Sequence, residues 1–183
     1  MVQKNKILLH ACCGICSGYP ISMLKENNFD ISVYFYNPNL DTEEEFNKRL
    51  NAQKKVCEFF DTELISEPYN HLEYLNYIQG LESEPEKGKR CIKCIELRLD
   101  KTAKKAQELG IEHFATSLVI SPHKNFEIIK EIADKCAEKY DIKYFDYNFR
   151  KKDGFLKTNK IAGNLNLYRQ NYCGCEFAKT HLR

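Results

Sequence analysis

Short apolar runs alternate along this chain with longer stretches in which apolar residues recur every three or four positions. The short runs have the length and the β-branched or aromatic content of strands, and they occupy residues 6–11, 30–36, 64–66, 113–118 and 143–145. The helical spacing occupies residues 19–24, 42–60, 72–78, 91–106 and 126–140. This alternation predicts βαβ units and a three-layer α/β fold with a mainly parallel, Rossmann-like sheet. Because parallel crossovers are right-handed, we expect the loops after the first and fourth strands at the same edge of the sheet.

Other stretches carry weaker patterns. The third helix is expected to bury Leu72, Leu75 and Ile78 on one face. Residues 79–90 contain two glycines, one proline and six charged residues, which predicts an exposed loop. After residue 146 the periodicity degrades into a basic segment punctuated by glycines, and no further helix is predicted there.

The length of the chain favours one domain that spans residues 1–183. A chain of this size buries about 70% of its unfolded surface, so it does not depend on disulfides to fold. The net charge is only +2, but residues 143–183 hold nine Lys and Arg against three Asp and Glu, so the remainder carries −4. We therefore expect a basic C-terminal segment, residues 147–183, that contacts a phosphate-bearing partner. The chain shows neither a membrane-spanning run nor a signal-peptide pattern, and we expect a cytoplasmic protein.

The chain contains nine cysteines, which is unusual for a cytoplasmic protein of this length. In that compartment cysteines serve metal binding or redox chemistry more often than disulfides. Cys57 and Cys136 fall on apolar helical stripes, and we expect them to pack in the core. The other seven form three groups: Cys12, Cys13 and Cys16; Cys91 and Cys94; Cys173 and Cys175.

The positions of these groups favour shared metal ligation. Cys12, Cys13 and Cys16 follow the first strand, at the carboxyl edge where ligands bind to open α/β sheets, and Gly14 is expected to allow a tight turn there. Cys91 and Cys94 begin a long helix and share one of its faces. The basic residues Lys89, Arg90 and Lys93 and the helix dipole are expected to lower the pKa values of these two thiols.

The number of thiols favours a site with more ligands than one structural zinc ion takes, but it does not identify the metal. A structural zinc ion takes four ligands and leaves three of the seven thiols without a function. A [4Fe–4S] cluster also takes up to four cysteines, and the remaining thiols can bind a second metal ion or take part in the chemistry. Cysteine spacing does not distinguish zinc from iron.

Five segments together resemble the epoxyqueuosine reductase family QueH. They are His10-Ala11-Cys12-Cys13-x-x-Cys16-Ser17, Arg90-Cys91-x-x-Cys94-x-Glu96-Leu97-Arg98-Leu99, Ile120-Ser121-Pro122-His123-Lys124, Lys151-Lys152-Asp153-Gly154-Phe155 and Leu167-Tyr168-Arg169-Gln170-x-Tyr172-Cys173-Gly174-Cys175. The resemblance extends from Lys6 to about Phe177. It implies a fold similar to the adenine nucleotide α-hydrolase (HUP) group, an iron–sulfur cluster of the [4Fe–4S] type and a nearby mononuclear iron. It also implies an oxidoreductase that removes the epoxide oxygen from epoxyqueuosine at the wobble position of tRNA and so forms queuosine.

This chemistry requires two electrons from an electron donor, two protons and metal ligands. Cys12, Cys13, Cys91, Cys94, Cys173 and Cys175 are expected to divide the ligation, with Cys16 as a further ligand. Tyr168, Asp153 and His10 are the candidate proton donors, with His123 and Tyr172 close to the same motifs, and each has the alternative of a structural hydrogen bond or packing role.

Contacts with the tRNA anticodon loop are expected from basic and aromatic side chains. The candidates for phosphate contacts are Arg150, Lys151, Lys152, Lys157, Lys160 and Arg169. The aromatic candidates for stacking on an unpaired base are Tyr168, Tyr172, Phe155 and Phe177, and packing in the core is the alternative for each.

Three other functions compete with this interpretation. An ATP-dependent tRNA-thiolating enzyme requires a glycine-rich anion loop after the first strand, where this chain has cysteines. A zinc-stabilised RNA-binding module without catalysis would be colourless when purified without oxygen. A thiol–disulfide redox protein needs only one pair of cysteines, so it would tolerate replacement of Cys12 or Cys173 by serine.

Overall fold

The computed structural model describes residues 5–181 and contains one five-stranded sheet in which all strands are parallel. The sheet order is β3-β2-β1-β4-β5. The strands are β1 (Asn5–His10), β2 (Phe29–Phe35), β3 (Glu63–Ser66), β4 (His113–Thr116) and β5 (Lys143–Tyr144). All five predicted strands are therefore confirmed, with ends that differ by one or two residues.

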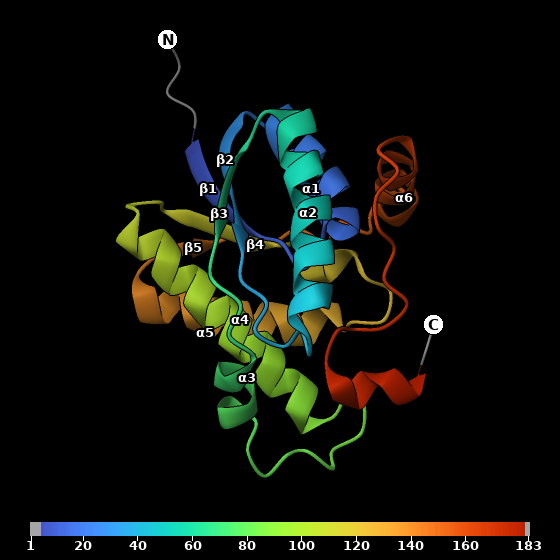
Figure 1. Cartoon of the computed structure of the whole chain (residues 1–183). Helices are drawn as coiled ribbons and strands as arrows, with labels where there is room; N and C mark the ends of the chain where they lie inside the picture. The colour runs from blue at the N-terminus through green and yellow to red at the C-terminus, as the bar shows by residue number, and fades with distance from the viewer. Residues whose placement is uncertain (1–4, 182–183) are drawn as a thin grey trace.

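Helices cover both faces of this sheet (Figure 1). On one face lie α1 (Gly14–Glu26), α2 (Glu43–Phe60) and α6 (Gly154–Asn164). On the other lie α4 (Lys89–Glu108) and α5 (Phe126–Tyr140), with α3 (His71–Tyr77) packed against α4. Two short 3₁₀ helices, η1 (Ser117–Ile120) and η2 (Glu176–His181), follow β4 and the last cysteine pair. This is the predicted three-layer α/β fold.

The order of the strands reverses beside β1. The chain adds β2 and β3 on one side of β1 and then returns to add β4 and β5 on its other side. Ile7, Leu8 and Leu9 of β1 are completely buried because helices cover both faces of the sheet. Ligands of such folds bind outside the carboxyl ends of the strands where the order reverses, which here is the point where β1 and β4 end.

The structure corrects three local expectations. The segment after residue 146 contains α6, which packs against α1, and its glycines and lysines concealed the helical pattern. Gly154 starts this helix where the chain passes so close to Phe149 that a side chain would overlap the Phe149 carbonyl oxygen. Leu72 of α3 is 65% exposed, and Tyr74 is buried in its place, whereas Ile78 is completely buried as expected. Helix α1 begins at Gly14, five residues earlier than expected.

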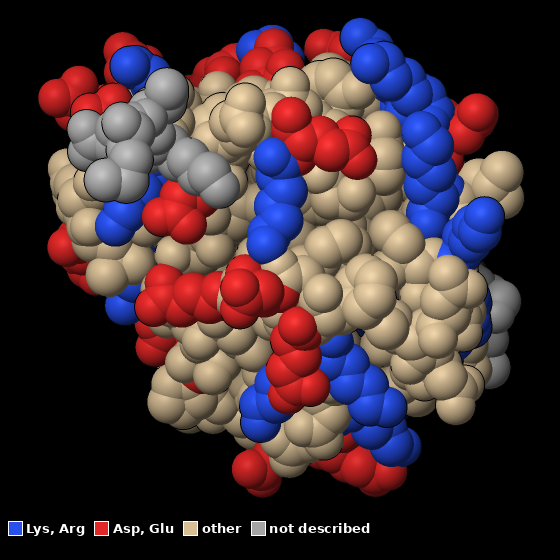
Figure 2. Space-filling model, turned by 90° about the horizontal axis from the view of Figure 1, so that it is seen from above, with Lys and Arg blue, Asp and Glu red and all other residues tan. Residues whose placement is uncertain are grey.

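Both signs of charge occur on the face of the molecule that is seen from above (Figure 2). On the face seen in Figure 2, groups of Lys and Arg lie among groups of Asp and Glu, with other residues between them. None of the helices within residues 5–181 is long and apolar enough to cross a membrane. The single-domain assignment for residues 1–183 remains a prediction, because residues 1–4 and 182–183 lie outside the described part of the chain.

Candidate metal centre

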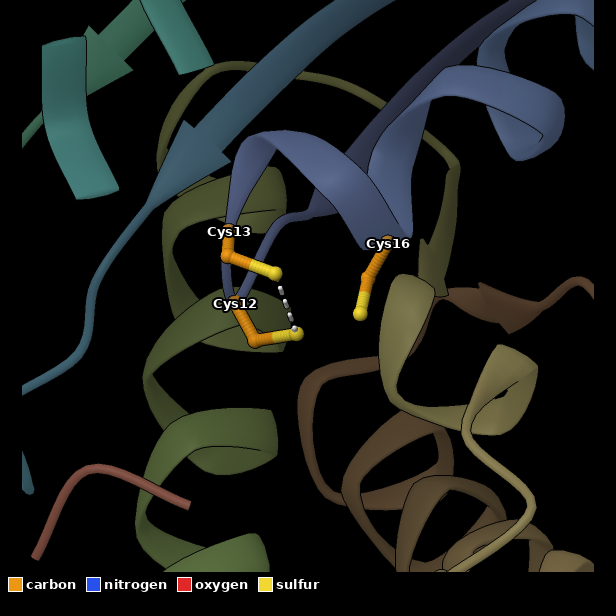
Figure 3. A group of neighbouring side chains, drawn as sticks. All are labelled: Cys12, Cys13 and Cys16. Atoms are coloured by element: carbon orange, nitrogen blue, oxygen red, sulfur yellow. Dashed lines mark hydrogen bonds between the residues drawn. The ribbon is translucent and has the colours of Figure 1, made fainter. Parts of the chain in front are cut away.

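Three thiols meet directly after β1. Cys13 is the N-cap residue of α1, and Cys12 and Cys16 lie on either side of it, so the end of the strand and the first helical turn bring their sulfurs together. The three sulfur atoms lie within 4.8 Å of one another, and they point into a common space (Figure 3). Gly14 serves this arrangement by close approach to α2 rather than by a tight turn, because a Cβ atom there would lie 2.6 Å from the carbonyl oxygen of Ala52.

Polar contacts fix this Cys12–Cys13–Cys16 group against other elements. The backbone N–H of Cys12 donates to Oγ of Ser117, the first residue after β4, and the Ser117 hydroxyl is 3.5 Å from the Cys12 sulfur. Gln170 Nε2 donates to the Cys13 sulfur at 2.9 Å. The loops after β1 and β4 therefore meet at one edge of the sheet, as predicted, and the C-terminal segment reaches the same place.

The three thiols differ in acidity. Hydrogen bonds with Cys13 and Cys16 hold the pKa of Cys12 well below the ordinary value of a thiol. The interaction with Cys12 raises the pKa of Cys13 to about 12, and it raises the pKa of Cys16 as well. Cys12 is therefore the most acidic thiol of the group.

The other four thiols form a second group, which is looser: among the described residues, only Cys12, Cys13 and Cys16 lie close enough together to hold a metal ion as they stand. The sulfur of Cys94 interacts electrostatically with those of Cys91 and Cys173, and the sulfur of Cys175 interacts with all three. Burial raises the pKa of Cys94, and burial together with Cys173 raises that of Cys175 to about 11. The predicted lowering of the pKa by neighbouring basic residues is thus wrong for Cys94 in the metal-free protein.

Arg90, one of the basic residues expected to act on these thiols, makes its contacts elsewhere. It is buried, and its guanidinium donates to the carbonyl oxygens of Glu82 and Glu84 while its Cζ lies 4.5 Å from the centre of the Phe177 ring. Arg90 therefore joins the loop before α4 to the segment after the last cysteine pair. Phe177 is the partner of this contact rather than an open stacking surface.

Two cations connect the two groups of thiols. The Arg98 guanidinium interacts electrostatically with the sulfurs of Cys94, Cys173 and Cys12, and its Nε donates to the carbonyl oxygen of Cys94. Lys124 Nζ donates to the Cys173 sulfur at 3.6 Å, and the charge of Cys173 raises the pKa of Lys124. Thiols from all three sequence groups therefore lie within electrostatic reach of the same two cations.

A cavity of about 320 Å³ opens between these groups. Cys12, Cys16 and Cys173 contribute to its wall, together with the cations Arg98 and Lys124. The remaining wall contains further polar and aromatic side chains, among them Asn37, Arg49, His123, Phe155, Asn159, Arg169, Gln170 and Tyr172. The cavity is large enough for a small ligand or one unstacked base.

Arg49 fixes the C-terminal segment to this cavity. Its Nε donates to Glu45 at 2.6 Å, and both side chains are less than 10% exposed. Its other nitrogens donate to the carbonyl oxygens of Tyr172 and Cys173. The Glu45 carboxylate also accepts the hydroxyl of Tyr168 at 2.7 Å, so one buried ion pair holds both α2 and the last cysteine pair.

Replacing Arg49 by methionine is expected to lower the free energy of unfolding by about 3–5 kcal/mol, because it leaves the Glu45 carboxylate buried without its cation. The matched control is Lys48→Met in the neighbouring exposed ion pair with Glu44, and we expect it to leave the unfolding midpoint nearly unchanged. Urea unfolding of both variants measures the difference. Equal stability of the two variants would contradict the structural role of Arg49.

The structure places the three predicted proton donors outside the cavity lining. His10 is completely buried, with Nδ1 against the Thr116 hydroxyl and Nε2 against the carbonyl oxygen of Tyr36, and burial lowers its pKa to about 4. Asp153 is exposed at the N-cap of α6. Tyr168 donates its hydroxyl to Glu45, and Glu45 in turn pairs with Arg49 on the cavity wall. His123 and Tyr172, the two neighbouring candidates, do line the cavity.

The six predicted phosphate contacts separate into three sets. Arg169 lines the thiol cavity, and its guanidinium donates to the side chain and the carbonyl oxygen of Asn159. Lys152, Lys157 and Lys160 line a different hollow. Arg150 and Lys151 belong to the turn before α6 and line neither.

Sequence reasoning assigned no role to the cations Arg49, Arg98 and Lys124. Arg98 and Lys124 lie in the segments that carried the resemblance, but a sequence does not say which basic side chains turn inward. The signal for Arg49 is its spacing of four residues from Glu45 on a predicted helix, which is typical of an ion pair.

Comparisons with known proteins agree on one family. The profile of the epoxyqueuosine reductase QueH family matches residues 7–181. A protein of this description from Streptococcus pyogenes serotype M1 is 38% identical over 181 residues, which covers 96% of this chain and 71% of that protein. Another, from Acinetobacter baylyi, is 37% identical and covers 96% of this chain and 81% of its own length. A third, from Dehalococcoides mccartyi, is 34% identical, and the match covers 95% of this chain and 92% of that protein.

Two solved structures share the fold. The U34-tRNA thiolase NcsA from Methanococcus maripaludis, solved with its [4Fe-4S] cluster, superposes with a TM-score of 0.56 at 15% identity, over 92% of this chain and 60% of that chain. A predicted subunit of a tRNA methyltransferase from Methanocaldococcus jannaschii superposes with a TM-score of 0.56 at 9% identity, over 87% of this chain and 74% of that chain. At such low identity the likeness shows the fold alone, which is the predicted α/β fold with a parallel sheet.

Proposed function

Because the chain belongs to the epoxyqueuosine reductase QueH family, whose reaction converts epoxyqueuosine to queuosine in tRNA, we propose that its seven clustered cysteines hold the iron centres of that reaction. The protein is an oxidoreductase that acts on tRNA, and the proposal concerns its cofactors and site residues. The observation that carries the proposal is the approach of thiols from three distant segments to Arg98 and Lys124.

The donor set fits two centres. Cys91, Cys94, Cys173 and Cys175 supply the four thiolates that a [4Fe–4S] cluster takes. Cys12, Cys13 and Cys16 supply three sulfur atoms within 4.8 Å of one another, and three protein ligands are the number found in a mononuclear metal site with an open position. Thiolate ligands of this kind select iron–sulfur clusters and zinc over harder metals. The NcsA structure adds an example of the same fold with a [4Fe-4S] cluster.

When bound, such centres supply single electrons and a Lewis acid for the departing epoxide oxygen. The protein contributes charge compensation, since Arg98 and Lys124 offset the negative charge of the thiolates. Lys124 also donates a hydrogen bond to Cys173, and hydrogen bonds to ligating sulfurs raise the reduction potential of a cluster. Arg49 and Glu45 hold the Cys173 backbone in position.

Opening an epoxide to an alkene consumes two electrons and two protons and releases water. The assignment of proton donation to Tyr168, Asp153 and His10 remains a prediction. The geometry favours a wall residue over these three, because a proton donor must reach the departing oxygen directly or through one water. Tyr172 and His123 are the wall residues among the sequence candidates.

Expression without oxygen tests the cofactor proposal. We expect a coloured protein with iron and sulfide in the ratio of a [4Fe–4S] cluster and one additional iron. When the gene is returned to cells that lack epoxyqueuosine reductase, mass spectrometry of tRNA nucleosides should show queuosine in place of epoxyqueuosine. Colourless, zinc-loaded protein would support the zinc-binding alternative, and dependence on ATP would support the thiolating one.

A further inference from the structure

A second hollow, of about 410 Å³, lies on the other side of α6 from the thiol cavity. Basic and aromatic side chains form much of its wall: Lys152, Lys157, Lys160, Tyr19, Phe145 and Tyr147. On α6, Phe155 and Asn159 are four positions apart and line the thiol cavity, whereas Lys157 and Lys160 are three apart and occupy the opposite side of the helix. Helix α6 lies at the edge of its layer beside α1 (Figure 1). It therefore separates the two hollows.

The three lysines of this hollow are available to bind an anion. In the part of the chain that the structure describes, none of them forms an ion pair. By contrast, every lysine of α5 is paired with an acidic side chain. The one acidic residue in the wall, Glu26, accepts the hydroxyl of Ser22 at 3.2 Å. The hollow is thus positively charged overall, and its lysines are not neutralised by the protein.

The aromatic side chains give this hollow a flat apolar side. The rings of Phe145 and Tyr147 are stacked with centroids 6.1 Å apart, and Lys157 Nζ lies 5.2 Å from the centre of the Tyr19 ring. Lysine ammonium groups bind phosphate, and aromatic walls accept the sugar or base of an unpaired nucleotide. A nucleotide carries both of these chemistries in one unit.

We propose that this hollow, lined by Lys152, Lys157 and Lys160, binds a nucleotide that flanks the reacting nucleotide in the anticodon loop of tRNA. The inference rests on the proposed function, because it takes the thiol cavity as the place of the reacting base. The width of one helix, about 10 Å with its side chains, lies between the two hollows, so a continuous RNA strand crosses α6 to occupy both. The hydrogen bonds from Arg169 to Asn159 attach the C-terminal segment to the side of α6 that faces the thiol cavity.

Binding measurements on the iron-loaded protein test this proposal. The variant Lys157→Gln/Lys160→Gln removes two charges from the hollow, and Lys54→Gln/Lys55→Gln removes two exposed charges from α2 as a matched control. We expect the Kd for an anticodon stem–loop RNA to rise about 10-fold or more in the first variant and to change little in the control. The slope of log K against log salt should decrease by about 0.7 for each phosphate group that the variant no longer neutralises.

The relative effects of these variants on binding decide whether the proposal holds. Equal weakening by the two variants, or no weakening by Lys157→Gln/Lys160→Gln, would overturn the proposal. If that variant loses affinity for a free nucleoside monophosphate but not for the RNA, the hollow binds a small molecule and the proposal is also wrong. The single variant Lys160→Gln, at an exposed position, provides the same test if the double variant folds poorly. A wild-type protein that binds the RNA without reducing epoxyqueuosine would contradict the proposed function and leave the hollow's role intact.

Discussion

Replacement of Cys12 by serine is expected to abolish the second iron and to lower epoxyqueuosine reduction by more than about 100-fold, because loss of an outer-shell partner alone commonly costs 10- to 100-fold. Cys12 is the most acidic thiol of its group, and it also interacts with Arg98 next to the second group. If the two groups hold separate centres, Cys12→Ser should retain sulfide and most of its iron. Cys94→Ser, by the same reasoning, should lose the sulfide.

The matched control is Cys136→Ala. Cys136 is also a buried thiol, but it packs on α5 away from the two groups, and we expect iron, sulfide and activity to be unchanged. Iron and sulfide analysis of the three variants, purified without oxygen, shows directly how the cysteines are divided between the two metal centres. Full activity and iron content in Cys12→Ser would exclude this thiol as a ligand and would support a redox protein that uses one cysteine pair.

The sheet and the location of the candidate site could be predicted from the sequence because both depend on patterns among residues that are close together in the chain. Each strand is a short apolar run, and the position of Cys12 directly after β1 puts it at the ligand edge of any parallel sheet. The two core cysteines, Cys57 and Cys136, were also predicted correctly, since each lies on a helical stripe that is buried.

The interior of the site could not be predicted because it depends on which side chains turn inward. His10 is next to the cysteines in sequence, yet a strand sends alternate side chains to opposite faces, and this one points into the core. Arg49 and Lys124 are distant in sequence from the cysteines that they contact. Helix α6 was missed because its buried side includes Gly154, Thr158 and Ala162, which are small residues that an apolar pattern does not reveal.

Gly154→Ala is expected to lower the free energy of unfolding by about 2–3 kcal/mol, since overpacking a close contact forces the backbone to move. A Cβ atom at this position would overlap the carbonyl oxygen of Phe149 and lie 2.7 Å from Cε1 of Tyr19, both in buried residues. The start of α6 therefore has to shift, and Phe155 follows directly after it on the wall of the thiol cavity. We expect reduced activity as well as reduced stability.

Gly163→Ala is the control on the same helix, because nothing lies within 4 Å of a Cβ atom there. Alanine in place of glycine in a helix is expected to stabilise the protein by about 0.5–1 kcal/mol. Thermal and urea unfolding should therefore show a lower unfolding midpoint for Gly154→Ala and a higher one for Gly163→Ala. This difference in sign is expected if close packing at Gly154, and not the number of glycines, sets the position of α6. A stabilised Gly154→Ala variant with unchanged activity would show that α6 tolerates displacement and that the thiol cavity does not depend on it.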